Sequence, residues 1–335
     1  MHLLIYGTQR VVTLIPTLLG LIILTFFLAR VVPADPAAVI AGEGASRQQI
    51  EALRQRYGFD QPLLTQLGLY LTQLATGNLG TSIYTGRPVL TDLRERFPAT
   101  LELTLVAITL ATLLGIPLGV YSALKRNSWV DHALRTCTTA GLAITGFWLA
   151  IMLQLLFSME LDLLPLGGRL GVPEPQAYTG FLLLDALLGG NGTAFLSALK
   201  HLILPALTLA YPAFATIVRF TRSGVLDVMQ RDFMLYERAM GLPRFLITFK
   251  YLLRNALTST VSQIGLLFGS LLAGAVVTEQ VFDWPGLGLY AVESIMKFDY
   301  QATLGITLWA GVAYSVVNLV VECTQAIIDP RVVRR

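Results

Sequence analysis

The stretch RDFMLYERAMGLPRFLITFKYLLRNAL, residues 231–257, is the segment from which the rest of the chain can be interpreted. It is a charged interruption between two apolar segments that are each long enough to cross a bilayer. Asp232 can cap a short helix over residues 233–240, and Gly241 suits the left-handed end of that helix. Pro243 suits the first turn of a second helix. The sequence therefore predicts a helix, a glycine turn and a second helix.

The second helix of this stretch is predicted to be amphipathic. Its apolar residues share one face at helical spacing, and its basic residues fall elsewhere. The apolar set is Phe245, Leu246, Phe249, Leu252 and Leu253, and the basic set is Arg244, Lys250 and Arg254. Such a segment is expected to lie against a surface and not to span a membrane. The surface is either lipid headgroups, which basic loops often contact, or a groove on a partner protein.

Composition places the chain among membrane proteins. Of its 335 residues 54% are hydrophobic and 13% are charged, whereas about a quarter of residues are charged in soluble domains. Cys137 and Cys323 both lie in apolar segments, as small hydrophobic residues do. The three histidines share no ligand spacing, so no metal site is predicted. The basic residues are spread over short loops, which indicates membrane orientation and not nucleic-acid binding.

Six apolar segments are long enough to span a membrane, because about 20 helical residues cover a hydrocarbon core of roughly 30 Å. They are residues 11–29, 99–124, 133–158, 198–220, 261–282 and 301–328. The sequence thus predicts an all-α polytopic membrane protein. Residues 1–30 form a cytoplasmic N-terminus with the first span, residues 31–97 form an extracytoplasmic loop subdomain, and residues 98–335 form a core of five spans that contains the charged loop 222–255.

Lysine and arginine in the short loops predict the orientation of these spans, since they accumulate on the cytoplasmic side. One side carries Lys125, Arg126, the basic residues from Arg222 to Arg254, and the C-terminal Arg331, Arg334 and Arg335. The short loops of the other side carry only Arg169 and Lys297. Both termini are therefore predicted to be cytoplasmic.

The loop subdomain contains two helix-like pieces, at residues 46–57 and 62–75. Ser46 followed by Gln49 resembles a capping box. Residues 77–89, GNLGTSIYTGRPV, are glycine-rich and predict turns.

Acidic residues inside spans are costly in hydrocarbon and often mark function. Glu102 and Glu322 are the candidates, and Glu279 lies near the end of the fifth span. A transport role and a helix-packing role both remain open for Glu102 and Glu322.

The chain lacks the motifs of common enzyme sites. It has no Gly-Lys dipeptide and therefore no GxxxxGK[ST] phosphate-binding loop, so ATP hydrolysis would need another polypeptide. It also has no G-x-S-x-G elbow and no H-E-x-x-H pair. No enzyme is predicted.

Residues 232–242, DFMLYERAMGL, resemble the loop by which permeases of bacterial ABC importers contact their ATPase subunit, specifically in the dipeptide, oligopeptide and nickel group. The glycine of that loop falls on Gly241 and its alanine on Ala239. The chain departs from the pattern at Tyr236 and Glu237, where small residues are usual, and at Met240, where lysine is usual.

Further matches to this group follow one another along nearly the whole chain. They are IPTLLG (15–20), VVPADPA (31–37), PATLELTL (98–105), GIPLGVYSALKRNSWVDHALR (115–135), TEQVFDWPGLG (278–288), DY (299–300) and DPR (329–331). The insertion TGFLLLDALL (179–188) before HLILPALTL (201–209) is most similar to the dipeptide-permease branch.

The resemblance implies the six-helix permease fold of a type I ABC importer that moves short peptides across the bacterial inner membrane. It implies a second homologous permease, two ATPase subunits that bind ATP and magnesium, and an extracytoplasmic binding protein; this chain itself would hold no cofactor. ATPase coupling would fall on Asp232, Glu237, Arg238, Ala239, Gly241, Leu242 and Arg254. The outer-loop candidates are Glu279, Trp284, Pro285, Gly286 and Gly288. The WPGLG segment among them could serve as a rigid outer lid or be a plain turn.

Several alternatives stay open at this point. The substrate could be a nickel or other metal chelate, or a glutathione-type molecule. The chain could also be an ion-coupled secondary carrier, which would require several ionisable groups at mid-membrane, or a structural membrane scaffold.

Overall fold

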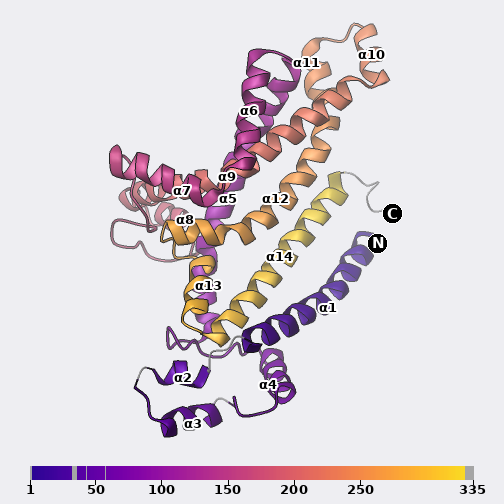
Figure 1. The fold of residues 1–335 in the computed structure, drawn as a ribbon. Coiled ribbons are helices and arrows are strands. Elements are labelled where there is room, and N and C mark those ends of the chain that lie inside the picture. Colours follow the sequence, from indigo (N-terminus) through magenta and orange to yellow (C-terminus); the bar gives the residue numbers. More distant parts are fainter. Residues whose placement is uncertain (1, 32–35, 43, 57, 329–335) are drawn as a thin grey trace.

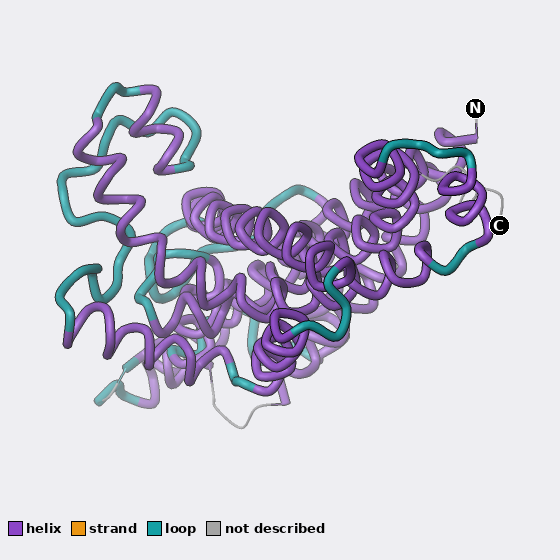
Figure 2. The backbone as a smooth tube through the Cα atoms, turned by 90° about the horizontal axis from the view of Figure 1, so that it is seen from above, coloured by secondary structure: helices purple, strands orange, loops and turns teal. Residues whose placement is uncertain are grey.

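The computed structural model describes residues 2–31, 36–42, 44–56 and 58–328, which form helices and loops without a strand. The long helices are α1 (His2–Val31), α5 (Val89–Leu124), α9 (Gly192–Met229), α12 (Leu253–Val281) and α14 (Tyr300–Ile328). Figure 1 shows them side by side as an elongated bundle. The start of α1 and the end of α14 lie close together (Figures 1 and 2). The all-α prediction is confirmed for the described residues.

Four helices of the described residues are long and apolar enough to cross a membrane alone: Val89–Leu124, Gly192–Met229, Ile247–Val281 and Tyr300–Val321. A bent helix pair would be a fifth span, and α1 has a shorter apolar stretch, Ile15–Leu28. The predicted number of six is compatible with this arrangement and stays a prediction. At about 1.5 Å per residue, α5 with its 36 residues and α9 with its 38 residues exceed a bilayer core and project beyond it.

The predicted third span, residues 133–158, is wrong as a continuous helix. It consists of α6 (Trp129–Ala143) and of α7 (Gly146–Gln154) with the π-helical turn η1 (Leu155–Glu160), and the two parts meet at 104°. Ile144 and Thr145 between them are extended, with ψ of 126° and 135°. Both residues are β-branched and a glycine follows, so the local sequence favours helix less than its hydropathy does.

The predicted second helix after Pro243 is also wrong as a separate element. Residues from α11 (Arg244–Leu246) through η2 (Ile247–Leu252) lead directly into α12. Between Pro243 and the end of α12 at Val281 the sequence has no proline that could stop the helix. This amphipathic segment is therefore the start of the fifth span and not a helix lying on a surface.

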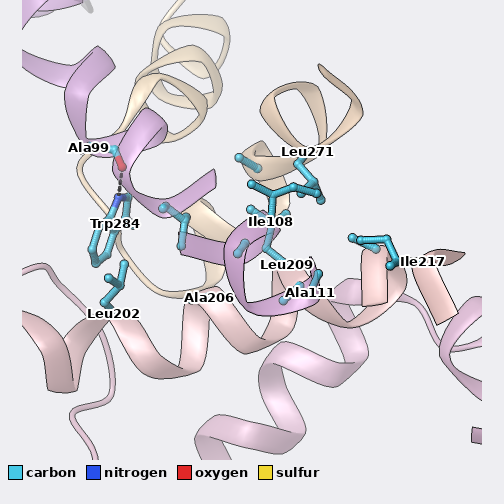
Figure 3. Packing of buried hydrophobic residues seen from close by; sticks show 14 residues of the cluster. Ala99, Ile108, Ala111, Leu202, Ala206, Leu209, Ile217, Leu271 and Trp284 are labelled. Carbon is cyan, nitrogen blue, oxygen red and sulfur yellow. Dashed lines mark hydrogen bonds between the residues drawn. The ribbon is translucent and has the colours of Figure 1, made fainter. Parts of the chain in front are cut away.

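The main core lies where α5, α9 and α12 pack against one another. It is a cluster of buried apolar side chains that includes Leu103, Ile108, Leu202, Leu209, Ile217, Leu271 and Trp284 (Figure 3). Glycines allow α5 and α9 to approach closely. A Cβ on Gly115 would lie 2.8 Å from Ile217 Cγ2, and a Cβ on Gly119 would lie 2.8 Å from the Val218 carbonyl. These two helices are thus joined almost backbone to backbone.

A small subdomain at one end of the bundle, which the sequence predicts to be extracytoplasmic and which we call the outer subdomain, contains α2 (Pro36–Ala41), α3 (Arg47–Arg56) and α4 (Leu63–Ala75). The predicted capping box is confirmed, because the Ser46 N–H donates to Gln49 Oε1 (2.9 Å) and the Gln49 N–H donates to Ser46 Oγ (3.3 Å). Both predicted helix-like pieces are present as α3 and α4. The subdomain lies at the opposite end of the molecule from α10 (Asp232–Ala239) and α11 (Figure 1).

Candidate functional site

The charged stretch forms a protruding unit at one end of the bundle, which we call the tip: α10, the Gly241 turn, α11 and η2 (Figure 1). The predicted short helix is confirmed as α10. Gly241 has a φ of +72°, so its predicted left-handed conformation is confirmed. The turn closes when the Met240 N–H donates to the Tyr236 carbonyl (3.0 Å). The tip is therefore a helix and a glycine turn that lead into a membrane span.

A buried side chain of α10 anchors the tip to the bundle. Met234 is 1% exposed. It packs in a cluster, called the tip cluster here, whose other members are Ala123, Val225, Val228, Ile247, Leu252 and Ala256. These residues come from α5, α9, η2 and α12. Met234 could not be singled out from the sequence, because a single methionine beside charged residues gives little local signal. Leu242, which follows the glycine turn, packs against the same cluster.

The opposite face of the tip is apolar and exposed. Leu235, Tyr236 and Met240 are exposed on and just after α10. The rings of Phe245 and Phe249 lie 4.5 Å apart between centroids and are also exposed. The predicted apolar face of the second helix is thus divided, since Leu252 is buried while the two phenylalanines are not. The π-helical turn η2 explains this division, because its extra residue per turn shifts the helical register.

The residues predicted for ATPase coupling all belong to the tip or to the start of α12. Asp232, Ala239, Gly241 and Arg254 are exposed, and Glu237 and Leu242 are half-buried. The side chain of Arg238 lies outside the described residues. A Cβ added to Gly241 would meet no atom within 4 Å, so this glycine is required by its backbone angle and not by a lack of space.

The predicted outer residues meet at the other end of α12, around the buried carboxylate of Glu279. Glu279 Oε1 accepts from the Thr100 hydroxyl of α5 (2.6 Å). Glu279 Oε2 accepts from the N–H groups of Gly288 (2.6 Å) and Leu289 (3.1 Å). These amides open α13 (Leu287–Met296), so the carboxylate caps the N-terminus of that helix. We call this arrangement the outer clamp.

The WPGLG segment is shaped to fit the outer clamp. Trp284 is 1% exposed and its Nε1–H donates to the Ala99 carbonyl of α5 (3.0 Å; Figure 3). A Cβ on Gly286 would lie 2.4 Å from the Glu279 carboxylate, and a Cβ on Gly288 would lie 2.5 Å from Val276 Cα. Only glycine fits at both positions. Pro285 is exposed, so of the five predicted outer residues it alone points away from the clamp.

Glu102 holds the outer loop that follows η1. Its Oε2 accepts from Arg169 Nη2 (2.6 Å), and its Oε1 accepts from the Leu183 N–H (2.8 Å) in α8 (Leu182–Leu188). Arg169 also donates to the Gly180 carbonyl (3.0 Å). These bonds tie the loop and the start of α8 to α5. The side chain of Glu322 lies outside the described residues.

A buried aspartate orders the same loop just before α8. Asp185 accepts from the Thr179 hydroxyl (2.7 Å) and from the N–H groups of Thr179 (2.8 Å) and Gly180 (3.0 Å). Burial alone would raise the pKa of Asp185, but these hydrogen bonds outweigh burial and hold that pKa below its ordinary value. The loop is therefore fastened by an ionised carboxylate at neutral pH.

A second aspartate at this end of the bundle could not be singled out from its local sequence. Asp299 is fully buried and accepts from the Ser82 hydroxyl (2.6 Å), the Tyr84 N–H (3.1 Å) and the Ala302 N–H at the start of α14 (3.1 Å). It thereby joins the glycine-rich turn segment 77–89 to α14. The DY pair carries a signal only as part of the family resemblance, because Ser82 and Tyr84, two of the three partners of its aspartate, lie more than 200 residues away in the chain.

Comparison with known proteins identifies relatives of the whole chain. Residues 115–334 match the family described as binding-protein-dependent transport system inner membrane component, and residues 3–104 match the N-terminal part of such membrane components. A probable D,D-dipeptide transport system permease of Escherichia coli K12 is 46% identical over 97% of this chain and 96% of that protein.

Other relatives have related names. A dipeptide transport system permease of Alkalihalophilus pseudofirmus is 38% identical over 98% of this chain and 99% of that protein. A glutathione transport system permease of Pectobacterium atrosepticum is 37% identical over 98% of both chains.

Proposed function

Because the chain belongs to the family of binding-protein-dependent transport system inner membrane components, we propose that its tip docks on an ATPase subunit and carries that subunit's motion into the membrane. The chain is the permease subunit of an ABC importer for peptides, a multi-pass protein of the inner membrane and not itself an enzyme. The secondary-carrier and scaffold alternatives are dropped, since neither describes this family.

The observation that carries the docking proposal is the two-sided construction of the tip. One side is fixed to α5, α9 and α12 through Met234. The other side presents exposed apolar side chains, among them Tyr236 and the neighbouring rings of Phe245 and Phe249. A short helix with exposed apolar anchors fits the groove of a partner protein. The buried anchor lets a displacement of α10 reach three spans directly.

We further propose the complete assembly: this chain, a second homologous permease, two ATPase subunits and an extracytoplasmic binding protein. ATP and magnesium would be bound by the ATPase subunits, in line with the missing Gly-Lys dipeptide of this chain. Both termini would be cytoplasmic, on the side of the tip. Closure of the ATPase pair would then move the tip and tilt the spans from an inward-open to an outward-open arrangement.

Dipeptides are the substrate that we propose first. The names of relatives at 38–46% identity over nearly the whole chain support this choice. Glutathione is the second candidate, because a permease with that name is 37% identical over 98% of the chain. No relative named here supports a nickel chelate.

The test uses the complete complex in liposomes with its binding protein. ATP hydrolysis and uptake are measured while dipeptides, glutathione and a nickel chelate are titrated separately. Dipeptides should stimulate both at the lowest concentration, and the purified permease alone should not hydrolyse ATP. Stimulation by the nickel chelate and not by peptides would contradict the substrate proposal. Saturable ATP hydrolysis by the permease alone would contradict the proposal that only the ATPase subunits bind and hydrolyse ATP.

A further inference from the structure

A buried ion pair lies at the end of the bundle that carries the tip. Asp131 in the first turn of α6 is fully buried. Its two oxygens accept from Arg222 of α9, at 2.7 Å from Nε and 2.9 Å from Nη2. They also accept from the Ser122 hydroxyl at the end of α5 (2.6 Å) and from the Asn127 N–H (3.0 Å). We call these four residues the basal knot, and they join three helices through one carboxylate.

The basal knot and the tip cluster are parts of one packed body. Ala123, the neighbour of Ser122, belongs to the tip cluster, as do Val225 and Val228, which follow Arg222 on α9. Arg222 lies seven residues before Met229, the last residue of α9, which corresponds to about 10 Å along the axis. A tight turn then leads to α10, where the Met234 N–H donates to the Arg231 carbonyl (3.0 Å). No flexible linker separates Arg222 from α10.

Close glycine contacts near the knot leave little room for α9 to slide along α5 or α12. A Cβ on Gly119 would lie 2.7 Å from Thr221 Cβ, where α5 crosses α9. A Cβ on Gly224 would lie 2.7 Å from the Ala256 carbonyl, where α9 crosses α12. Near the knot, α9 is joined to α6 by the Arg222–Asp131 ion pair. A two-pronged arginine–carboxylate pair fixes direction as well as distance, which apolar packing alone does not.

α6 leads away from the knot to the broken joint of the third span. Asp131 is near its first residue, and its last residue, Ala143, precedes the 104° bend at Ile144 and Thr145. Along its length α6 follows α9: the Tyr211 hydroxyl of α9 donates to the Cys137 carbonyl (3.1 Å), and a Cβ on Gly141 would lie 3.1 Å from Ala215 Cβ. A displacement of α9 that the knot transmits would therefore arrive at the bend.

From this geometry we propose that Asp131 and Arg222 are the positioning pair that couples the tip to α6. When a partner displaces α10, the pair makes α6 follow α9, so that the motion reaches the joint between α6 and α7. Buried ion pairs contribute little net stability because of their desolvation cost, and their best-attested use is to fix register. The inference rests on the proposed docking of the tip on an ATPase subunit.

The test compares ATP hydrolysis and peptide uptake by the complete complex in liposomes. We expect Asp131→Asn and Arg222→Gln to lower uptake about ten-fold or more while hydrolysis stays within about two-fold, since a coupling free energy is lost and not a reaction step. Arg222→Lys keeps the charge without the fork and should be intermediate. Arg219→Gln is the matched control, because Arg219 is exposed on the same helix.

A distance measurement separates positioning from a merely structural role. Spin labels are placed at the exposed Thr136 of α6 and Gln230 at the end of α9, with Cys137 and Cys323 replaced by serine. With Asp131 and Arg222 both present, the distance between the two labels should be narrowly distributed and the same with and without ATP. In Asp131→Asn, the distribution of this distance should broaden. A wild-type distance that changes with ATP would overturn the proposal. So would equal losses of uptake and hydrolysis with a narrow distance, or no loss in either.

Two further outcomes also test the proposal: failure of the variants to assemble, and absence of uptake by the wild-type complex. If the Asp131 and Arg222 variants fail to assemble, Ser122→Ala removes one hydrogen bond of the knot and should lower uptake per ATP hydrolysed; an unchanged ratio would overturn the proposal. Absence of peptide uptake by the wild-type complex would instead contradict the proposed function, and the distance measurement would still test the knot.

Discussion

Gly241 shows how one residue can set the shape of the tip. Its φ of +72° lies in the region that residues with a Cβ resist, while the space around it is open. The cost of a side chain at this position is therefore backbone strain and not steric overlap. Since Leu242, the next residue, packs against the tip cluster, a change in the turn would alter how α10 is presented.

We expect Gly241→Val to leave the protein inserted and folded but to weaken ATPase association and abolish uptake. The strain is on the order of 1–3 kcal/mol if the turn is kept, and otherwise the chain leaves the turn in a new direction. Gly241→Ala should be milder. The measurements are co-purification of the ATPase subunits and uptake, and Lys250→Gln, an exposed change in η2, is the control. Normal uptake by an intact Gly241→Val complex would show that the tip is only a loop lying on lipid.

Some residues could be identified from the sequence and others could not. Gly241 and Glu279 were found because a glycine after a helical pattern and an acid inside an apolar run are local signals. Asp131 was not singled out, since its partners on α5 and α9 become neighbours only when the helices pack. The same is true of Asp299, whose partners Ser82 and Tyr84 lie in a distant turn.

At the scale of elements, α13 depends on the outer clamp. Its first amides donate to Glu279, while the Leu287 N–H donates to the Thr100 hydroxyl (2.8 Å). One carboxylate therefore links α5, α12 and α13. The three groups that hydrogen-bond to this carboxylate, one hydroxyl and two amides, are all donors. A glutamine at this position has one oxygen that accepts and one nitrogen that donates, so it cannot accept hydrogen bonds from all three donors.

We expect Glu279→Gln to destabilise the protein by about 1–3 kcal/mol, because the amide nitrogen would face N–H or O–H donors in a buried site. The measurement is the melting temperature of the purified protein in detergent, with hydrogen exchange of residues 286–296 as the local probe. The control is Glu51→Gln, which removes an exposed pair with Arg54 in the outer subdomain. An unchanged melting temperature with protected α13 amides would contradict the clamp.

Long apolar elements were predictable and their interruptions were not. Hydropathy located α5, α9, α12 and α14, but it treats residues 133–158 as uniform. The break at Ile144 and Thr145 leaves the apolar pattern intact and changes only backbone angles. Pro243 led to the opposite error, since it suggested a separate helix where the chain continues into α12. A proline in the first turn of a helix does not interrupt the turns after it, so it cannot show how long that helix is.

At the scale of the whole molecule, the spans differ in how far the chain itself covers them. In the most apolar window of α9 67% of the residues are buried, against 22% for residues 247–281 and 17% for α14. α9 is therefore the central helix of the chain, and the spans that begin at η2 and at α14 are the least covered by the rest of the chain. An uncovered apolar face of this kind is what lipid or a second membrane subunit would contact.

We expect residues 46 and 176 to face the extracytoplasmic side, and residues 126, 244 and 335 to face the cytoplasm, because basic residues of short loops stay inside. Single cysteines at these positions, in a chain without its native cysteines, are treated with an impermeant thiol reagent on intact and on opened cells. Ser46→Cys and Gln176→Cys should react in both, and Arg126→Cys only after opening. Reaction of Arg244→Cys from outside would contradict the topology.

The bend between α6 and α7 also has a consequence for the surrounding lipid. α6 has 15 residues and rises about 22 Å, while a typical hydrocarbon core is roughly 30 Å thick. By contrast, α5 has 36 residues and rises about 54 Å along its axis. α6 on its own is therefore shorter than the core, whereas α5 extends past it. We expect the lipid beside α6 to thin locally to match the length of this helix.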